Sequence, residues 1–487
     1  MDAVMDVLGA IAEALLSLVA APYLYIAVLF VWWQARQGNQ LQRRLFHVRL
    51  RASLAVAGDR LLAGLAAGAA LSAAGFGLGA GLSADTVVCA WIATAVLALL
   101  RLRFVCLAYA AGALGVVRTA LAALPADGLN EPAASFVRTL AGIDAPSLLL
   151  LAGLLHVAEG WLVRRQGARH AVPLFTLGKR GKPMGAYALS GAWPVPLLWL
   201  VPAAGTGAGG FELPWTPLLG LGAHVSAWSL AAFPVLIGFS DRTETRWPEQ
   251  AARWTGNRLL LYGGVLTLAA AAAFYWRWAE LAASLLAIVL HEGLLLWSRL
   301  REAGRPPAYA QNGRGVTVLA VLPGTPADEM GLLPGEVIVK VNGMPVRDKE
   351  ALHAALQLQP AFCKLEVLNR EGHVKFAQRA RYAGEHYQLG IILAPDDDAD
   401  YVVVPRADSL WRQLRQAGAR RRRGAALPAG EAGAGPELAA AAEEQAAAAE
   451  GANAAGEAAP APAEAGGSGP APAPAEPGLP PRRARRR

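Results

Sequence analysis

The first 300 residues alternate between long apolar runs and short polar segments. A helix that crosses a membrane needs about 20 apolar residues, and windows of that kind recur along this stretch. They lie at residues 8–33, 61–82, 86–100, 104–124, 148–163, 187–202, 217–239, 259–276 and 278–297. Several are short or rich in Gly and Pro. The pattern therefore predicts a membrane all-α helical bundle of about seven to nine transmembrane helices over residues 1–300.

Lys and Arg concentrate in every second loop between these runs. They gather at residues 34–60, 101–103, 164–182, 242–258 and 299–305, whereas the intervening loops carry few positive charges. Cytoplasmic loops of membrane proteins are enriched in Lys and Arg. We therefore expect an outside N-terminus and a cytoplasmic location for everything after Arg299. If one short run is re-entrant, the N-terminus lies inside and the second half is cytoplasmic all the same.

A second pattern begins at residue 315 and predicts a small α+β, mostly-β domain over residues 301–406. Residues 316–322 alternate apolar and other positions like a half-buried strand, and a one-turn helix follows with Pro326 at its first position. Residues 336–341 form the next predicted strand, which the hairpin signal Asn342-Gly343 closes. Asp348 can cap a helix that runs to about Gln357, and strands are predicted at 363–369, 373–378 and 387–393.

The run GTPADEMGLLPGEVIVKVNG in this domain resembles the core of a bacterial PDZ domain. Glu336 stands where that family more often has Asp. A PDZ domain binds an extended peptide as an added strand, and backbone N–H groups of an apolar-Gly-apolar loop hold the peptide's terminal carboxylate. The residues that match the PDZ pattern are Gly324, Pro326, Ala327, Gly331, Leu332, Gly335, Asn342 and Gly343.

The apolar-Gly-apolar loop usually precedes the first strand in bacterial PDZ domains, but here the matching sequence comes last. The resemblance therefore implies a circularly permuted order of the strands. The implied peptide-binding residues are Leu389, Gly390, Ile391 and Ile392 in the last strand and Leu352, Ala355 and Leu356 on the predicted helix. The alternative interpretation is that residues 389–393 form only a closing core strand with Gly390 at a bulge.

Of the 487 residues in the whole chain, 54% are hydrophobic and 17% are charged. These values are averages over an apolar membrane half and a more polar remainder. The net charge of +8 comes from Arg-rich patches beside apolar runs and at the C-terminus, so we expect contact with a membrane and no nucleic acid. Cys89, Cys106 and Cys363 suggest no disulfide framework. Asp2 and Asp6 replace a basic leader, so we interpret the first run as a retained span.

Beyond the PDZ-like domain the chain becomes polar and repetitive. Residues 407–423 predict a basic juxtamembrane-type helix whose charges, from Arg412 to Arg423, would contact anionic lipid. A solvated run of charges is the alternative. Residues 424–487 are rich in Ala, Pro, Glu and Arg, and we predict that this tail is disordered.

Ionisable residues inside predicted spans are costly and are therefore candidates for function. They are His156, Glu159, His224, His291 and Glu292. The pair His291-Glu292 beside a PDZ-like domain suggests an intramembrane metalloprotease, whose zinc motif is His-Glu-x-x-His. Leu295 occupies the position of the second His, and no later apolar run offers a further Asp ligand. We therefore expect no metal, no cofactor and no catalytic residue, and we interpret these groups as interhelical polar contacts.

The soluble half contains no nucleophile–base constellation, phosphate loop or Cys/His metal spacing. The chain, with many predicted spans followed by one PDZ domain, resembles the MinJ-type division-topology proteins of Gram-positive bacteria over residues 1–404. The late sequence EHYQLGIILAPD is part of this resemblance. That resemblance implies a membrane scaffold, enriched at the septum and poles, that links DivIVA-like to MinD-like proteins in septum site determination. The tail after Gly424 departs from the family pattern.

Two other functions remain compatible with the sequence. A degenerate, site-2-type intramembrane metalloprotease predicts stoichiometric zinc that His291→Ala abolishes. A transporter with a regulatory PDZ domain predicts solute uptake in proteoliposomes. An adaptor that recruits cytoplasmic proteins through strand addition requires neither.

Overall fold

The computed structural model describes residues 2–46, 48, 50–101, 104–123, 130–203, 210–219, 225, 227–359, 362–380 and 389–396. Two compact units divide the chain between Leu427 and Pro428, and all described residues belong to the first. His224, the predicted basic helix at 407–423 and the tail at 424–487 lie outside the described residues. The predicted boundary between residues 300 and 301 stays a prediction.

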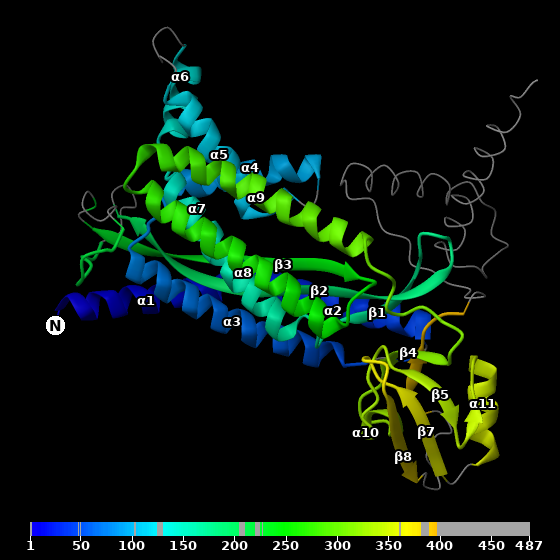
Figure 1. Cartoon of the computed structure of the whole chain (residues 1–487). Helices are drawn as coiled ribbons and strands as arrows, with labels where there is room; N and C mark the ends of the chain where they lie inside the picture. Colours follow the sequence, from blue (N-terminus) through cyan, green and yellow to red (C-terminus); the bar gives the residue numbers. More distant parts are fainter. Residues whose placement is uncertain are drawn as a thin grey trace, which may run out of the picture. The chain divides into compact units, whose positions relative to one another are not determined.

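The N-terminal half contains nine helices and three strands among its described residues (Figure 1). The helices are α1 (Asp2–Ala20), α2 (Pro22–Phe46), α3 (Ser53–Leu78), α4 (Ala84–Leu100), α5 (Leu107–Leu121), α6 (Glu131–Ala141), α7 (Ala145–Gln166), α8 (Pro248–Ala273) and α9 (Arg277–Ala303). The strands β1 (Val172–Leu177), β2 (Pro183–Pro202) and β3 (Trp228–Thr243) form one antiparallel sheet in the order β1-β2-β3.

Three of these helices, α3, α7 and α9, are long and apolar enough to cross a membrane. A fourth candidate span arises if α1 and α2, which meet at a 57° bend, count as one. The helices α4 and α5 are apolar but shorter. The predicted number of seven to nine transmembrane helices is therefore not confirmed for the part of the chain that the structure describes.

The prediction of an all-α bundle is wrong for two apolar windows. Residues 187–202 lie in strand β2, and the described residues of the window at 217–239 include most of strand β3. The two strands pair from Tyr187↔Thr243 to Pro202↔Trp228. Proline lacks the amide that a helix interior needs, and β2 contains Pro194 and Pro196 in the middle of its apolar run. An apolar run of this length does not by itself distinguish a spanning helix from a buried strand.

Helix α3 covers the edge of β2 that faces away from β3. A Cβ atom on Gly64 would lie 2.1 Å from the Pro194 carbonyl oxygen, and one on Gly68 would lie 2.3 Å from the Pro196 carbonyl oxygen. The Leu198 amide donates to the Ser72 hydroxyl at 2.9 Å. The missing side chains on α3 thus let the helix backbone approach the strand backbone directly.

The C-terminal half contains a small α+β domain, as the sequence predicts. Its elements are β4 (Val316–Val321), α10 (Pro326–Glu329), β5 (Val337–Val341), β6 (Met344–Pro345), α11 (Lys349–Leu358), β7 (Phe362–Leu368), β8 (Val374–Ala380) and β9 (Ile391–Leu393). The sheet order is β8-β7-β5-β4-β9, and β6 pairs with β5. Val316, Ile338, Val341, Leu365 and Val367 are fully buried in its core.

The close approach of α3 to β2 leads to a test of stability. We expect Gly68→Ala to destabilise the detergent-solubilised protein, because overpacking at a tight contact costs about 1–3 kcal/mol. Gly77→Ala on the same helix is the matched control, since its Cβ meets nothing within 4 Å. Thermal unfolding of both variants measures the difference. Equal melting temperatures for the two variants would contradict the packing of α3 on β2.

Candidate functional site

The last strand of the PDZ-like domain, β9, lies at the end of the described sheet beside β4. The Leu322 amide donates to the Gly390 carbonyl and the Ala394 amide donates to the Thr317 carbonyl, both at 2.9 Å. Amides alternate between the two sides of an antiparallel strand. The N–H groups of Ile391 and Leu393 therefore point away from β4.

The side chains of this last segment divide between two faces. Leu389 is buried in the core of the domain, and Ile391 and Leu393 pack against the same core while keeping part of their surface exposed. Ile392 is buried on the opposite face, in a cluster with Tyr309. The strand is therefore part of the fold, and its outward amides and half-exposed side chains define a candidate peptide-binding edge.

Gly390 is required by the geometry of the loop that leads into β9. Its φ is +78°, and a Cβ atom there would lie 2.4 Å from the Thr325 side chain at the start of α10. The Ala327 amide donates to the Leu389 carbonyl at 3.0 Å, which ties the loop to α10. This places the apolar-Gly-apolar sequence against the short helix rather than at an ordinary bulge.

The predicted cap of α11 is confirmed, because the Asp348 carboxylate accepts the Ala351 amide at 2.7 Å. Leu352, Ala355 and Leu356 on this helix are buried in the core together with Leu389. Their side chains therefore pack in the core rather than line an open surface. Their part in peptide binding stays a prediction.

The residues of the PDZ pattern occupy the turns and the core that the resemblance implies. Ala327 and Leu332 are buried, and Pro326 begins α10. The backbone has positive φ at Gly324, Gly331, Gly335, Asn342 and Gly343.

Glu336, the departure from the pattern, is almost fully buried. It accepts the Leu333 amide at 2.9 Å and pairs with Lys375 at 3.1 Å, so it fastens β8 to the turn before β5. A carboxylate with these partners is a structural group.

A contact between the PDZ-like domain and the first turn of α8 was not predicted from the sequence. The Trp247 ring packs directly on Gly335, so closely that a Cβ atom on Gly335 would lie only 1.9 Å from the ring. The Arg370 guanidinium lies 4.9 Å from the centre of the same ring, and Tyr309 contacts the ring edge-on at 5.4 Å. Arg370 also pairs with Glu249 at 3.5 Å. Burial raises the pKa of the Tyr309 hydroxyl, which keeps it neutral at this contact.

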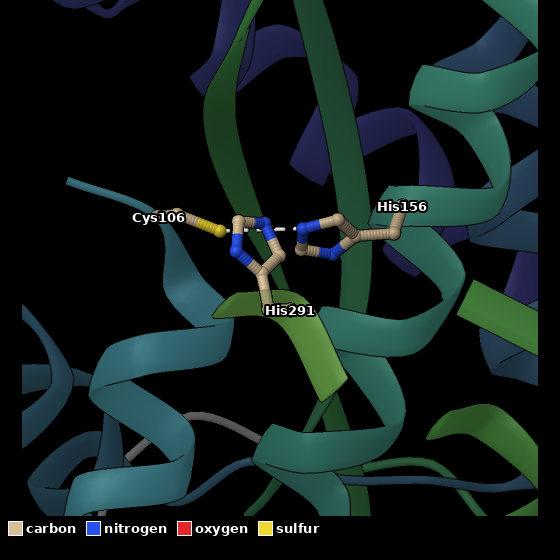
Figure 2. A group of neighbouring side chains, drawn as sticks. All are labelled: Cys106, His156 and His291. Carbon is tan, nitrogen blue, oxygen red and sulfur yellow. Dashed lines mark hydrogen bonds between the residues drawn. The ribbon is translucent and has the colours of Figure 1, made fainter. Parts of the chain in front are cut away.

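A second group of polar residues meets inside the helical half. Cys106, which precedes α5, His156 on α7 and His291 on α9 offer ligand atoms that all lie within 4.8 Å of one another. Figure 2 shows the three side chains pointing toward one another. Glu159 lies one turn beyond His156, with 3.9 Å between its Oε2 and the His156 Nε2. Glu292 joins the group through the Tyr109 hydroxyl.

The structure thus brings together four of the five intramembrane polar residues named from the sequence. Sequence reasoning missed Cys106 and Tyr109, because both lie in an apolar run and are compatible with simple packing. Cys106 lies 50 residues before His156, and His156 lies 135 residues before His291, separations that no periodicity can bridge.

A family model described as a PDZ domain matches residues 317–370. The protein is therefore a helical chain with candidate membrane spans that carries a PDZ domain. Longer alignments connect it to proteins named cell division topological determinant MinJ. It is 32% identical over 261 residues to the protein of that name from Bacillus subtilis, which covers 53% of this chain and 64% of that protein.

Further relatives differ in how much of the chain they match. A probable cell division topological determinant MinJ from Lacticaseibacillus paracasei is 28% identical over 272 residues, which covers 53% of this chain and 69% of that protein. A putative Do-like protease 14 from Arabidopsis thaliana is 44% identical over 52 residues, only 11% of this chain. The resemblance to the MinJ-type proteins is confirmed, and the chain aligns with less than two thirds of the Bacillus relative's length.

The contact of Trp247 leads to a prediction about the segment before β4. The Ala308 amide donates to the Glu244 carbonyl at 2.8 Å, next to the Trp247–Tyr309 pair. We expect Trp247→Ala to speed amide hydrogen exchange across residues 304–310, because the packing that protects this bond is lost. Trp278→Ala is the control, since that side chain is 72% exposed. Unchanged exchange in Trp247→Ala would show that the contact does not hold the domain.

Proposed function

We propose that this chain is a membrane-anchored adaptor whose cytoplasmic PDZ domain recruits protein partners by strand addition. The observation that carries the proposal is the outer side of β9, where the N–H groups of Ile391 and Leu393 point away from β4. An extended peptide can pair with such an edge and place alternate side chains toward the domain. Helix α11 would form the other wall of the groove, as the resemblance to PDZ domains implies.

The order of the strands supports a circularly permuted PDZ domain. The strand that follows the apolar-Gly-apolar sequence, β9, is the last described strand, and it pairs antiparallel with β4 at the start of the domain. Main-chain pairing depends on the position of a strand in the sheet and not on its position in the sequence. The groove between β9 and α11 can therefore form although β9 comes last in the domain and pairs with its first strand, β4.

The cellular role rests on similarity to proteins named cell division topological determinants. We propose that the chain acts in division-site selection at the septum and poles, where it bridges DivIVA-like and MinD-like proteins. The membrane half would fix the position, and the PDZ domain would supply one of the two protein contacts. The basic loops of the helical half favour a cytoplasmic PDZ domain, because Arg299 and Arg301 lie near the end of α9, just before that domain.

The matches to proteases do not favour an enzyme. They cover only 10% to 11% of this chain. Each of these matches is about as long as the matched PDZ segment. It therefore gives no reason to assign the catalytic residues of a protease to this protein.

The edge of β9 is tested by removing one outward amide. We expect Ile391→Pro to weaken binding of C-terminal peptides to the full-length protein in nanodiscs by at least about tenfold, because proline lacks the N–H that pairs with the added strand. Val374→Pro at the opposite edge strand β8 is the matched control and keeps wild-type affinity. Fluorescence anisotropy with a panel of peptides measures both.

Two outcomes would refute the groove assignment: no peptide of the panel binds, or both proline variants bind equally well. A Gly390→Val variant is unsuitable for this purpose. Its positive φ and the contact with Thr325 would disturb the fold as well as the groove.

The cellular role is tested by location. We expect a fluorescent fusion of the full-length chain to concentrate at the septum and poles of dividing cells, as the proposed bridging requires. The Ile391→Pro fusion should remain in the membrane while recruiting less of the PDZ partner. A wild-type fusion spread evenly over the membrane contradicts the role in division-site selection, whatever the peptide measurements show.

A further inference from the structure

The polar group at the junction of α5, α7 and α9 contains two imidazoles whose free nitrogens can be assigned. The Nδ1 atom of His156 lies 2.7 Å from the Ala152 carbonyl oxygen. A carbonyl oxygen only accepts, so Nδ1 carries the proton and donates it. The Nε2 atom of His156 therefore presents a lone pair, and it lies 3.3 Å from the Cys106 sulfur.

The second imidazole is fixed in the same way by a hydroxyl group. The Tyr109 hydroxyl donates its single proton to the Glu292 carboxylate at 2.7 Å. Its oxygen lies 2.8 Å from Nδ1 of His291, and so it accepts a hydrogen bond from that nitrogen. The Nε2 atom of His291 then also presents a lone pair. Figure 2 shows this ring facing both the Cys106 sulfur and the His156 ring.

Two imidazoles thus converge with one thiol, since the ligand atoms of Cys106, His156 and His291 all lie within 4.8 Å of one another. The Glu159 carboxylate lies beside this group, 3.9 Å from Nε2 of His156. The Cys106 thiol has one proton and can satisfy only one of the two imidazoles. The His156 side chain is only 4% exposed, so water has little access to its Nε2 atom. A cation among the three ligand atoms would satisfy both imidazoles and the thiolate together, with Glu159 as a neighbouring carboxylate.

We propose that Cys106, His156, His291 and Glu159 bind one zinc-class divalent ion. Zinc bonds of about 2.0–2.3 Å to nitrogen and sulfur place two ligands of a tetrahedron about 3.3–3.7 Å apart. The separation of 3.3 Å between Cys106 and His156 already matches this range. A thiolate with two imidazoles favours zinc over calcium or magnesium, which prefer oxygen ligands.

The surroundings of the two imidazoles resemble those of metal-bound histidines. Such ligands donate their second N–H to a carbonyl or to a carboxylate network, which fixes the ring and raises its basicity. Ala152 plays this part for His156, and Tyr109 with Glu292 plays it for His291. Binding replaces the thiol proton of Cys106 with the ion and releases that proton to solvent.

With Glu159 as the fourth ligand beside the three grouped residues, the ion has no open position, so the proposed site is structural rather than catalytic. It joins the start of α5 to α7 and to α9, and α9 is the helix that leads to the PDZ domain. A network of interhelical hydrogen bonds is the alternative that uses the same residues without a metal. The two differ in metal content and in the chemistry of Cys106.

Metal content is measured on the full-length protein in detergent micelles, with any affinity tag removed. The protein is loaded with zinc and dialysed against metal-free buffer before mass spectrometry. We expect about one zinc per chain in the wild type and in the control His353→Gln, a histidine of the PDZ domain. Cys106→Ser, His156→Gln and His291→Gln should lose it. Tyr109→Phe keeps all four ligands and should bind zinc about 10–100-fold more weakly.

Cobalt supplies a readout that does not depend on the folding of the variants. Co²⁺ added to the wild-type protein should give the charge-transfer absorption of a thiolate–cobalt bond, and this absorption should be absent from Cys106→Ser. Wild-type protein that retains no zinc and shows no such absorption overturns the proposal. Retention of zinc that is equal in all variants overturns it as well. Peptide binding at β9 is measured separately, so either proposal can fail alone.

Discussion

Strand β2 lies among apolar helices, so each of its backbone amides needs a partner or must be absent. Strand β3 satisfies one edge along its length, and β1 covers part of the other. Where β1 ends, Pro194 and Pro196 carry no N–H group, and the Leu198 amide donates to Ser72 on α3. Prolines that would interrupt a helix thus remove unpaired donors from a strand edge that packs on a helix instead of a further strand.

The glycine face of α3 follows from the same constraint. The carbonyl oxygens of Pro194 and Pro196 approach Gly64 and Gly68 at distances that leave no room for a side chain. Elsewhere in the helical half, several polar side chains are paired between helices. Arg118 on α5 pairs with Glu280 on α9, and the Tyr262 hydroxyl on α8 donates to the Ala287 carbonyl on α9 at 2.7 Å. The group around Cys106 belongs to this set of interhelical contacts, and it differs by presenting several acceptors to one centre.

The PDZ domain attaches to this scaffold through a shared apolar cluster that includes Tyr187, Leu319 and Ile392, and through aromatic and cationic side chains around Trp247. Trp247 at the start of α8 contacts Gly335, Arg370 and Tyr309. Stacking of an arginine on an indole contributes about 0.5–2 kcal/mol, depending on how well the pair is shielded from water. The face of β9 that carries Ile392 is turned toward Tyr309, whereas Ile391 and Leu393 face the domain core.

The sequence by itself determined what short-range chemistry controls. Proline and glycine at fixed offsets predicted α10 and its turns, Asp348 predicted the cap of α11, and the motif identified the PDZ domain that the family model also matches. Only the tertiary structure decided that residues 187–202 form a strand, since an apolar run has the same composition in a buried strand and in a spanning helix. It also decided that Cys106, His156 and His291 meet. Their convergence depends on how three distant helices pack, and no local pattern records that packing.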